Sequence, residues 1–299
     1  ERRTIMEKTE TTKESKKTTE AKALEKAKQS VINAIDENGN GAIDIEDIII
    51  KALKIPGIKI ERSDFLRAEL NVKYPENVIE AAISETPSAA GIDVKVLDKI
   101  ADNVIQRERV AVSGISAVLG LPGSFAMLAT IPADIAQYYG YMLRTAQKLM
   151  YLYGFPQIDL TDEGNGIDSE TINMLTLCLG VMYGVAGANN AVKTMAKALA
   201  TGVPKQLLKR ALTKGTIYPI VKQTAKWFGV KMTKEVFAGF FKKSIPVVGV
   251  AIGGGLTYLT FKPCCEKLKN NLRKTKLVNP NDDSGDVIDL TKEEADIKE

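Results

Sequence analysis

Residues 110–155 read VAVSGISAVLGLPGSFAMLATIPADIAQYYGYMLRTAQKLMYLYGF, and the rest of the chain is organised around them. The first 24 positions, residues 110–133, carry no charge, are rich in Gly, Ala and Ser, and are interrupted by Pro122. Small residues of this kind let helices pack closely, either in a protein core or in lipid. The stretch therefore predicts a buried helical hairpin or a segment that enters a lipid surface.

The second half of this stretch predicts one long helix with defined ends. Thr130 and Pro132 are typical of a helix start, because proline is well tolerated in a first turn whose amide has no partner. Asp134 falls in that turn, where a negative charge suits the helix dipole. Apolar side chains then recur at spacings of three and four residues, and Gly154 with Pro156 predicts the end of the helix.

Composition favours an all-α fold. The 299 residues are 44% hydrophobic and only 6% aromatic, and strand-like alternation is hard to find. Three uncharged runs, residues 110–133, 171–192 and 244–261, approach the roughly 20 residues that a membrane span needs. Because they contain internal Pro or Asn or many Gly, we interpret them as core helices of a multi-helical globular domain in preference to membrane spans.

The residue types that are missing restrict the chemistry. The chain has no histidine, which excludes an imidazole base and any metal site with a His ligand. Its three cysteines, Cys178, Cys264 and Cys265, lack the spacing of a zinc site and fit a reducing compartment. We therefore expect a cytoplasmic protein and leave open whether it attaches peripherally to a membrane.

A twelve-residue segment, DENGNGAIDIED at residues 36–47, resembles the calcium-binding loop of an EF-hand. Hard cations need a ring of oxygen ligands, and Gly41 stands at the sixth position, where the chain turns sharply. Apolar helical segments precede and follow the loop. The predicted ligands of Ca²⁺, or of Mg²⁺, are Asp36, Asn38, Asn40, the carbonyl of Ala42, Asp44 and Asp47.

Two departures from the usual loop predict weak binding. Asp47 stands at position 12, where the longer Glu normally ligates through both oxygens, and Asn at positions 3 and 5 lowers the ligand charge. No second loop of full length accompanies this one, although EF-hands generally pair. The alternative interpretation is an Asx-rich turn between two helices.

The order of segments within residues 90–275 resembles the EcsC family. The resemblance is carried by a helix with LDKIADNVI, the stretch from IPADIAQYYG to MYLYGF, a second Gly- and Ala-rich helix and a late IPVVGVAIGGG run. The most telling positions are Pro132 and Asp134 at a helix start, Tyr153 and Gly154 at its end, and Ile245 and Pro246 at the start of the glycine run. The resemblance implies a helical, cytoplasmic or membrane-peripheral protein without an established enzymatic activity.

Asp134 is the one candidate for a buried catalytic carboxylate, with Gln137 and Tyr141 on the same helical face. A carboxylate in an apolar pocket would indicate an enzyme, which is one alternative to a non-enzymatic function. A helix-capping aspartate is the more common explanation of such a position.

Charge is distributed unevenly along the chain. Residues 193–276 hold 18 Lys and Arg against two Asp and Glu, whereas residues 277–299 hold two against eight. Cations interleaved with aromatic residues favour an anionic membrane or lipid surface, and a plain solvated surface is the alternative. Nucleic acid is disfavoured, because no nucleic-acid motif is present. The candidate membrane-binding residues are Lys205, Lys209, Arg210, Lys222, Lys226, Trp227, Phe228, Lys242 and Lys243.

The acidic tail contains a short apolar motif, DDSGDVIDLTKEE at residues 282–294. It resembles a motif that binds the small ubiquitin-like modifier by adding a strand to a sheet edge of that partner. A soluble adaptor that acts through the tail is therefore a further alternative. The motif residues are Val287, Ile288, Asp289 and Leu290.

The predicted organisation has four parts: a disordered leader at residues 1–20, an EF-hand-like helical region at 21–86, an EcsC-like all-α domain at 90–276 and an acidic disordered tail at 277–299. We expect a non-enzymatic, calcium-binding helical protein that associates peripherally with a membrane or lipid. Calcium would change the angle between the two helices that flank its loop and so expose or cover apolar surface.

Overall fold

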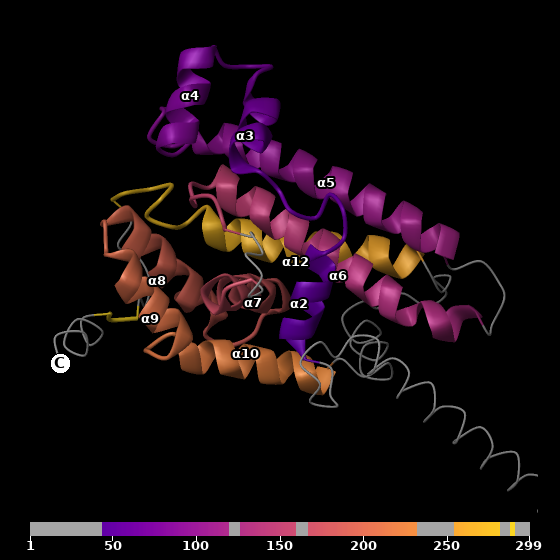
Figure 1. The fold of residues 1–299 in the computed structure, drawn as a ribbon. Helices are drawn as coiled ribbons and strands as arrows, with labels where there is room; N and C mark the ends of the chain where they lie inside the picture. Colours follow the sequence, from indigo (N-terminus) through magenta and orange to yellow (C-terminus); the bar gives the residue numbers. More distant parts are fainter. Residues whose placement is uncertain (1–43, 120–125, 160–166, 232–253, 282–287, 291–299) are drawn as a thin grey trace, which may run out of the picture.

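The fold is built from α-helices alone in every part of the chain that the computed structural model describes, which is residues 44–119, 126–159, 167–231, 254–281 and 288–290 (Figure 1). The all-α fold expected from the sequence is therefore confirmed. In chain order the helices are α2 (Ile45–Leu53), α3 (Arg62–Leu70), α4 (Glu76–Ser84), α5 (Val94–Leu119), α6 (Ala126–Leu152), α7 (Ser169–Tyr183), α8 (Ala188–Ala200), α9 (Lys205–Thr213), α10 (Tyr218–Lys231) and α12 (Gly254–Leu272).

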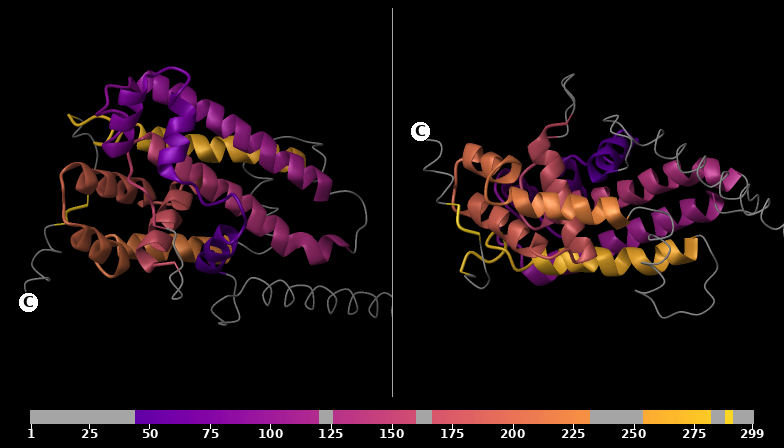
Figure 2. Two further views of the ribbon diagram at one scale, coloured as in Figure 1. Left: turned by 45° about the horizontal axis from the view of Figure 1, so that its top comes forward. Right: turned by 90° about the horizontal axis from the view of Figure 1, so that it is seen from below.

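Three long helices form one side of the molecule. α5, α6 and α12 lie side by side, with α12 packed against both of the others (Figure 2). α8, α9 and α10 lie on the other side of α7, and α3 with α4 forms a small hairpin at one end, where α3 packs on α6 (Figure 1). None of the described helices is long and apolar enough to cross a bilayer.

α7 is the centre of the core. It contacts α2, α6, α8, α9, α10 and α12, and most of its side chains are buried. Asp168 caps its first turn by accepting hydrogen bonds from the amides of Glu170 and Thr171 (2.8 and 3.1 Å), and Gly184 ends the helix with a φ of 75°. The uncharged run at residues 171–192 is therefore core, as predicted, although the turn after Gly184 divides it between α7 and α8.

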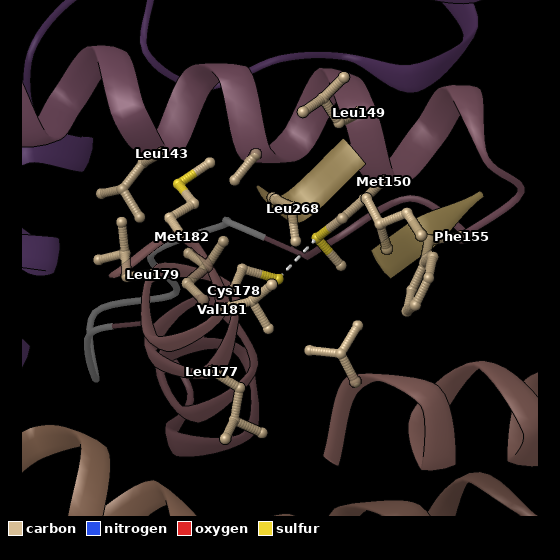
Figure 3. Close-up of a cluster of buried hydrophobic side chains, with 14 of the residues drawn as sticks. Leu143, Leu149, Met150, Phe155, Leu177, Cys178, Leu179, Val181, Met182 and Leu268 are labelled. Carbon is tan, nitrogen blue, oxygen red and sulfur yellow. Dashed lines mark hydrogen bonds between the residues drawn. The ribbon is translucent and has the colours of Figure 1, made fainter. Parts of the chain in front are cut away.

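The interior around α7 is closely packed and apolar (Figure 3). Cys178 of α7 and Met150 of α6 meet there, with their sulfur atoms 3.4 Å apart. Leucine side chains from α6, α7 and α12 surround this pair, and both sulfur-bearing residues are fully buried. The centre of the molecule is therefore filled by side chains of two consecutive helices, α6 and α7, and of the distant helix α12.

The N-terminal helices share this core. α2 packs against α6 and α7, and all of its apolar residues except the partly buried Ile50 are buried. The side-chain amide of Gln147 on α6 accepts a hydrogen bond from the Ile60 amide (3.0 Å) and donates one to the Ile58 carbonyl (3.1 Å), which joins the loop after α2 to the centre of the fold. The predicted boundary at residues 86–90 is thus not a break in packing within the described residues.

α6 begins earlier than the sequence predicted. The expected start was at Thr130 and Pro132, whereas the helix begins at Ala126 and places Pro132 in its second turn. Ala, Met and Leu precede the proline and favour helix strongly enough to offset the one backbone hydrogen bond that proline removes. The predicted end is confirmed, because Gly154 has a φ of 95° and the Phe155 amide closes the helix on the Met150 carbonyl (2.9 Å).

Gly180 on α7 is the position where the close packing of the core is most directly testable. A Cβ placed there would lie 2.8 Å from Cγ2 of Thr224 on α10 and 3.0 Å from Cβ of Ala188 on α8. We expect Gly180→Ala to destabilise the protein by about 1–3 kcal/mol in chemical denaturation. Gly114→Ala on α5, where nothing lies within 4 Å of the new Cβ, is the control and should be neutral or stabilising. Equal effects of the two changes would contradict this packing.

Candidate functional site

The described residues contain only the last part of the predicted calcium loop. Asp36, Asn38, Asn40 and Ala42 lie outside them, whereas Asp44 and Asp47 lie within. Helix α2 begins at Ile45, so the predicted loop runs directly into a helix, as a helix–loop–helix calcium motif requires. The described residues hold no group of three or more acidic, Cys or His side chains that could bind a metal.

Asp44 and Asp47 form a capping box at the start of α2. The Asp44 carboxylate accepts a hydrogen bond from the Asp47 amide (3.1 Å), and the Asp47 carboxylate accepts one from the Asp44 amide (3.5 Å). Asp47 is fully buried, and burial together with the charge of Asp44 raises the pKa of the neighbouring Glu46 above its ordinary value. The two aspartates carry oxygen atoms of the kind that Ca²⁺ prefers as ligands, and in the capping box they accept hydrogen bonds from two amides at the helix N-terminus.

α8, α9 and α10 come from a part of the sequence in which every charged residue is basic. Residues 188–231 contain nine Lys and Arg and no Asp or Glu. α9 shows how this arises, because its leucine and alanine side chains are buried against the core and its cations are left outside. We use the term basic surface for the exposed cations of these three helices, which are Lys197, Lys205, Lys209, Lys222 and Lys226.

Four of the predicted membrane-binding residues belong to this basic surface, and another one is buried. Lys205, Lys209, Lys222 and Lys226 are exposed, and Arg210 is partly exposed. The prediction for Phe228 is wrong, because its ring is fully buried and packs edge-on against Tyr183, with ring centres 5.3 Å apart. Trp227 is partly buried beside them, and Lys242 and Lys243 lie outside the described residues.

The position of Asp134 within its helix differs from the prediction. Because α6 begins at Ala126, Asp134 is not in the first turn and cannot cap the helix; its side chain lies outside the described residues. One turn further along, Tyr138 and Tyr139 are buried, and burial raises the pKa of both phenols far above their ordinary value. Both tyrosines are therefore neutral at physiological pH.

The cysteines have no nucleophilic character. All three are buried, and burial raises the pKa of the Cys178 thiol to about 12 and that of Cys264 to about 11. The pKa of Cys265 is raised in the same way. Thiolate chemistry requires a lowered thiol pKa and access, and these groups have neither.

The C-terminal motif is partly described and is in contact with the helical body. Ile288, Asp289 and Leu290 lie within the described residues, and Val287 lies outside them. The amide of Ile288 donates a hydrogen bond to Oγ1 of Thr194 on α8 (2.9 Å). Residues 277–281 and 288–290 of the predicted tail thus lie within the described residues, and the side chains of Ile288 and Leu290 pack against the core.

Sequence reasoning did not single out two buried ionic groups. Arg62 at the start of α3 is 7% exposed, and Glu108 of α5 is 4% exposed beside Lys148 of α6. No local pattern marks these residues, since their partners lie far away in the chain. They join helices to one another and are therefore determinants of stability.

Comparison with protein-family models, with curated proteins and with solved structures finds no match to this chain. The resemblance to the EcsC family therefore stays a prediction made from the sequence.

Proposed function

We propose that the chain is a non-enzymatic, calcium-binding helical protein that attaches peripherally to anionic lipid through the basic surface. The observation that carries this proposal is the set of exposed lysines on α8–α10, in a region of the sequence without a single acidic residue. Each cation near an anionic bilayer contributes about 1 kcal/mol, so several together give useful affinity without an inserted helix.

The packing of α2 supports a link between calcium and this surface. α2 follows the predicted calcium loop directly and contacts α6, α7 and α10. α10 carries Lys222 and Lys226, so a change in the position of α2 would act on a helix that belongs to the basic surface. A ligand shifts such an equilibrium only by its difference in affinity for the two arrangements, so weak calcium binding predicts a modest effect.

Vesicle co-sedimentation of the full chain tests the lipid part of the proposal. Vesicles that contain phosphatidylserine should pellet the protein, and vesicles of phosphatidylcholine alone should not. Lys222→Gln with Lys226→Gln should weaken binding by about 30-fold, the equivalent of about 2 kcal/mol. Lys95→Gln with Lys99→Gln is the matched control, since these two exposed lysines are also four residues apart on one helix, α5. Absence of pelleting with and without chelator would overturn the proposal.

Calorimetric titration of the full chain with calcium tests the metal part. We expect one site with a dissociation constant of about 10⁻⁵ M or weaker, because the loop has few charged ligands and a short Asp at position 12. Asp36→Asn removes the first predicted ligand and should abolish the heat of binding. Glu46→Gln is the control, because position 11 of the loop is not a ligand position. A calcium response that survives Asp36→Asn would place the metal elsewhere.

A further inference from the structure

Three residues of the acidic tail bind to the body of the same chain. Ile288 donates its amide hydrogen to Oγ1 of Thr194 (2.9 Å), and the Thr194 hydroxyl donates in turn to the carbonyl of Asn190 (2.8 Å). Thr194 is only 1% exposed, so its oxygen is a buried acceptor that the tail satisfies. Figure 1 shows the short tail segment in yellow beside the end of the molecule that α8 and α9 form.

The segment binds with its side chains in an alternating pattern. Ile288 and Leu290 are partly buried and pack against the core, whereas Asp289 between them is exposed. The apolar pair therefore packs against the protein, and the acid between them keeps contact with solvent. α8 thus provides a docking position for a short segment with an apolar–acidic–apolar pattern.

The charges on the two sides of this contact are opposite. Residues 277–299 hold eight Asp and Glu against two Lys and Arg, and the docking position lies on α8, one of the three basic helices. Asp289 belongs to the docked segment itself, and Lys193 and Lys197 lie on α8 on either side of Thr194, the residue that the segment contacts. The docked segment therefore brings an acidic residue to a basic helix.

We propose that Ile288–Leu290 is an intramolecular ligand of α8, and that it holds the acidic tail beside the basic surface so that the tail competes with anionic lipid. This inference rests on the proposed attachment of the basic surface to lipid. A ligand tethered by a short linker has an effective concentration on the order of 1 mM, so even a weak contact is populated until a stronger anionic surface displaces it. Docking also uses the Ile288 amide, which the same motif would need in order to pair with a partner strand.

The decisive variant carries Ile288→Ser together with Leu290→Ser in the full chain. It removes the apolar contacts of the tail and leaves every charge in place. We expect its affinity for vesicles of phosphatidylserine and phosphatidylcholine to rise several-fold over the unmodified chain, with the largest gain at low salt. Ile297→Ser is the matched control, an identical change in the same tail outside the docked segment, and it should bind vesicles like the unmodified chain.

A second measurement separates docking from lipid competition. A labelled peptide of residues 284–294 added to the full-length double variant should bind, and it should bind much less to the unmodified chain, whose own tail occupies the position. If unmodified and variant chains bind vesicles equally, the competition is refuted and lipid attachment stands. If neither binds vesicles and the peptide still binds only the double variant, lipid attachment fails, and with it the competition. If the peptide binds neither chain, docking of the tail is refuted.

Discussion

Replacement of Arg62 by methionine is expected to lower the free energy of unfolding by about 3 kcal/mol or more, because a buried hydrogen bond to a charged group contributes about 1.5–3 kcal/mol. The Arg62 guanidinium donates from Nε to the carbonyl of Phe155 (3.0 Å). It also donates to the carbonyls of Ile83, Ala82 and Glu85 (2.5, 3.0 and 3.1 Å), which lie in or directly after the last turn of α4.

Among the described residues, Arg62 is the donor to all four of these carbonyls. The last carbonyls of a helix lack intrahelical partners, and a carbonyl after the end of α6 is in the same position. One planar cation at 7% exposure donates to carbonyls at both helix ends and joins the α3–α4 hairpin to the end of α6. Methionine fills a similar volume but donates nothing, so it would leave buried acceptors without a donor.

Chemical denaturation checks the expectation, with two comparison variants. Arg62→Lys keeps the charge but cannot reproduce the planar fork of donors, so it should recover only a small part of the loss. Arg67→Met on the same helix is the matched control: Arg67 is exposed and pairs with Glu76 and Glu80 at the surface, and its loss should leave the midpoint almost unchanged. Similar losses of stability for Arg62→Met and Arg67→Met would contradict the conclusion that the buried hydrogen bonds of Arg62 stabilise the fold.

The roles of Arg62 and its partners illustrate what the sequence could not supply. The position of α4 at residues 76–84 was predictable from apolar spacing, and so was the end of α6, because Gly154 adopts a backbone conformation that favours glycine. The contact between Arg62 and Phe155 joins positions 93 residues apart. Periodicity describes one helix at a time and carries no information on such partners.

The wrong assignment of Phe228 to the membrane-binding residues has a different origin, because the sequence does contain the pattern that marks this residue as buried. Val221, Thr224 and Phe228 are buried and recur at spacings of three and four, which defines the inner side of α10. Phe228 is two positions from Lys226, which is about 200° around a helix of 3.6 residues per turn. The aromatic ring and the cation therefore had to face opposite ways, and only the lysine could belong to the basic surface.

Replacement of Glu108 by glutamine is the second change with a large expected effect. Oε1 of Glu108 lies 2.5 Å from Nζ of Lys148 and 3.2 Å from Nε of Arg144, in the seam between α5 and α6. Glu108 and Lys148 are 4% and 8% exposed, so the variant would leave an ammonium group buried without a counter-charge. Breaking a buried pair in this way costs about 3–5 kcal/mol at neutral pH.

The loss of stability caused by Glu108→Gln should decrease as the pH rises, because it originates in the charge of the buried Lys148 ammonium group. Burial lowers the pKa of Lys148 in the folded protein below its ordinary value of 10.5, and Glu108 opposes that shift. Between the lowered value and 10.5 the unfolded chain binds more protons than the folded chain, so stability rises with pH across this window. Glu108→Gln extends the window to lower pH, since it removes the group that raises the Lys148 pKa. The destabilisation should therefore be large at neutral pH and shrink as the solution becomes alkaline.

A double variant provides the control for this prediction. Glu108→Gln with Lys148→Met removes both charges of the pair, and replacing a buried ion pair by neutral groups of similar volume is often close to neutral in stability. Arg144 keeps its hydrogen bond to the Gly57 carbonyl (2.9 Å) and is more exposed to solvent, so it needs the carboxylate less. We expect the double variant to regain most of the lost stability and to lose the alkaline recovery. A single variant that is as stable as the unmodified protein at neutral pH would mean that Glu108 and Lys148 are not paired in solution.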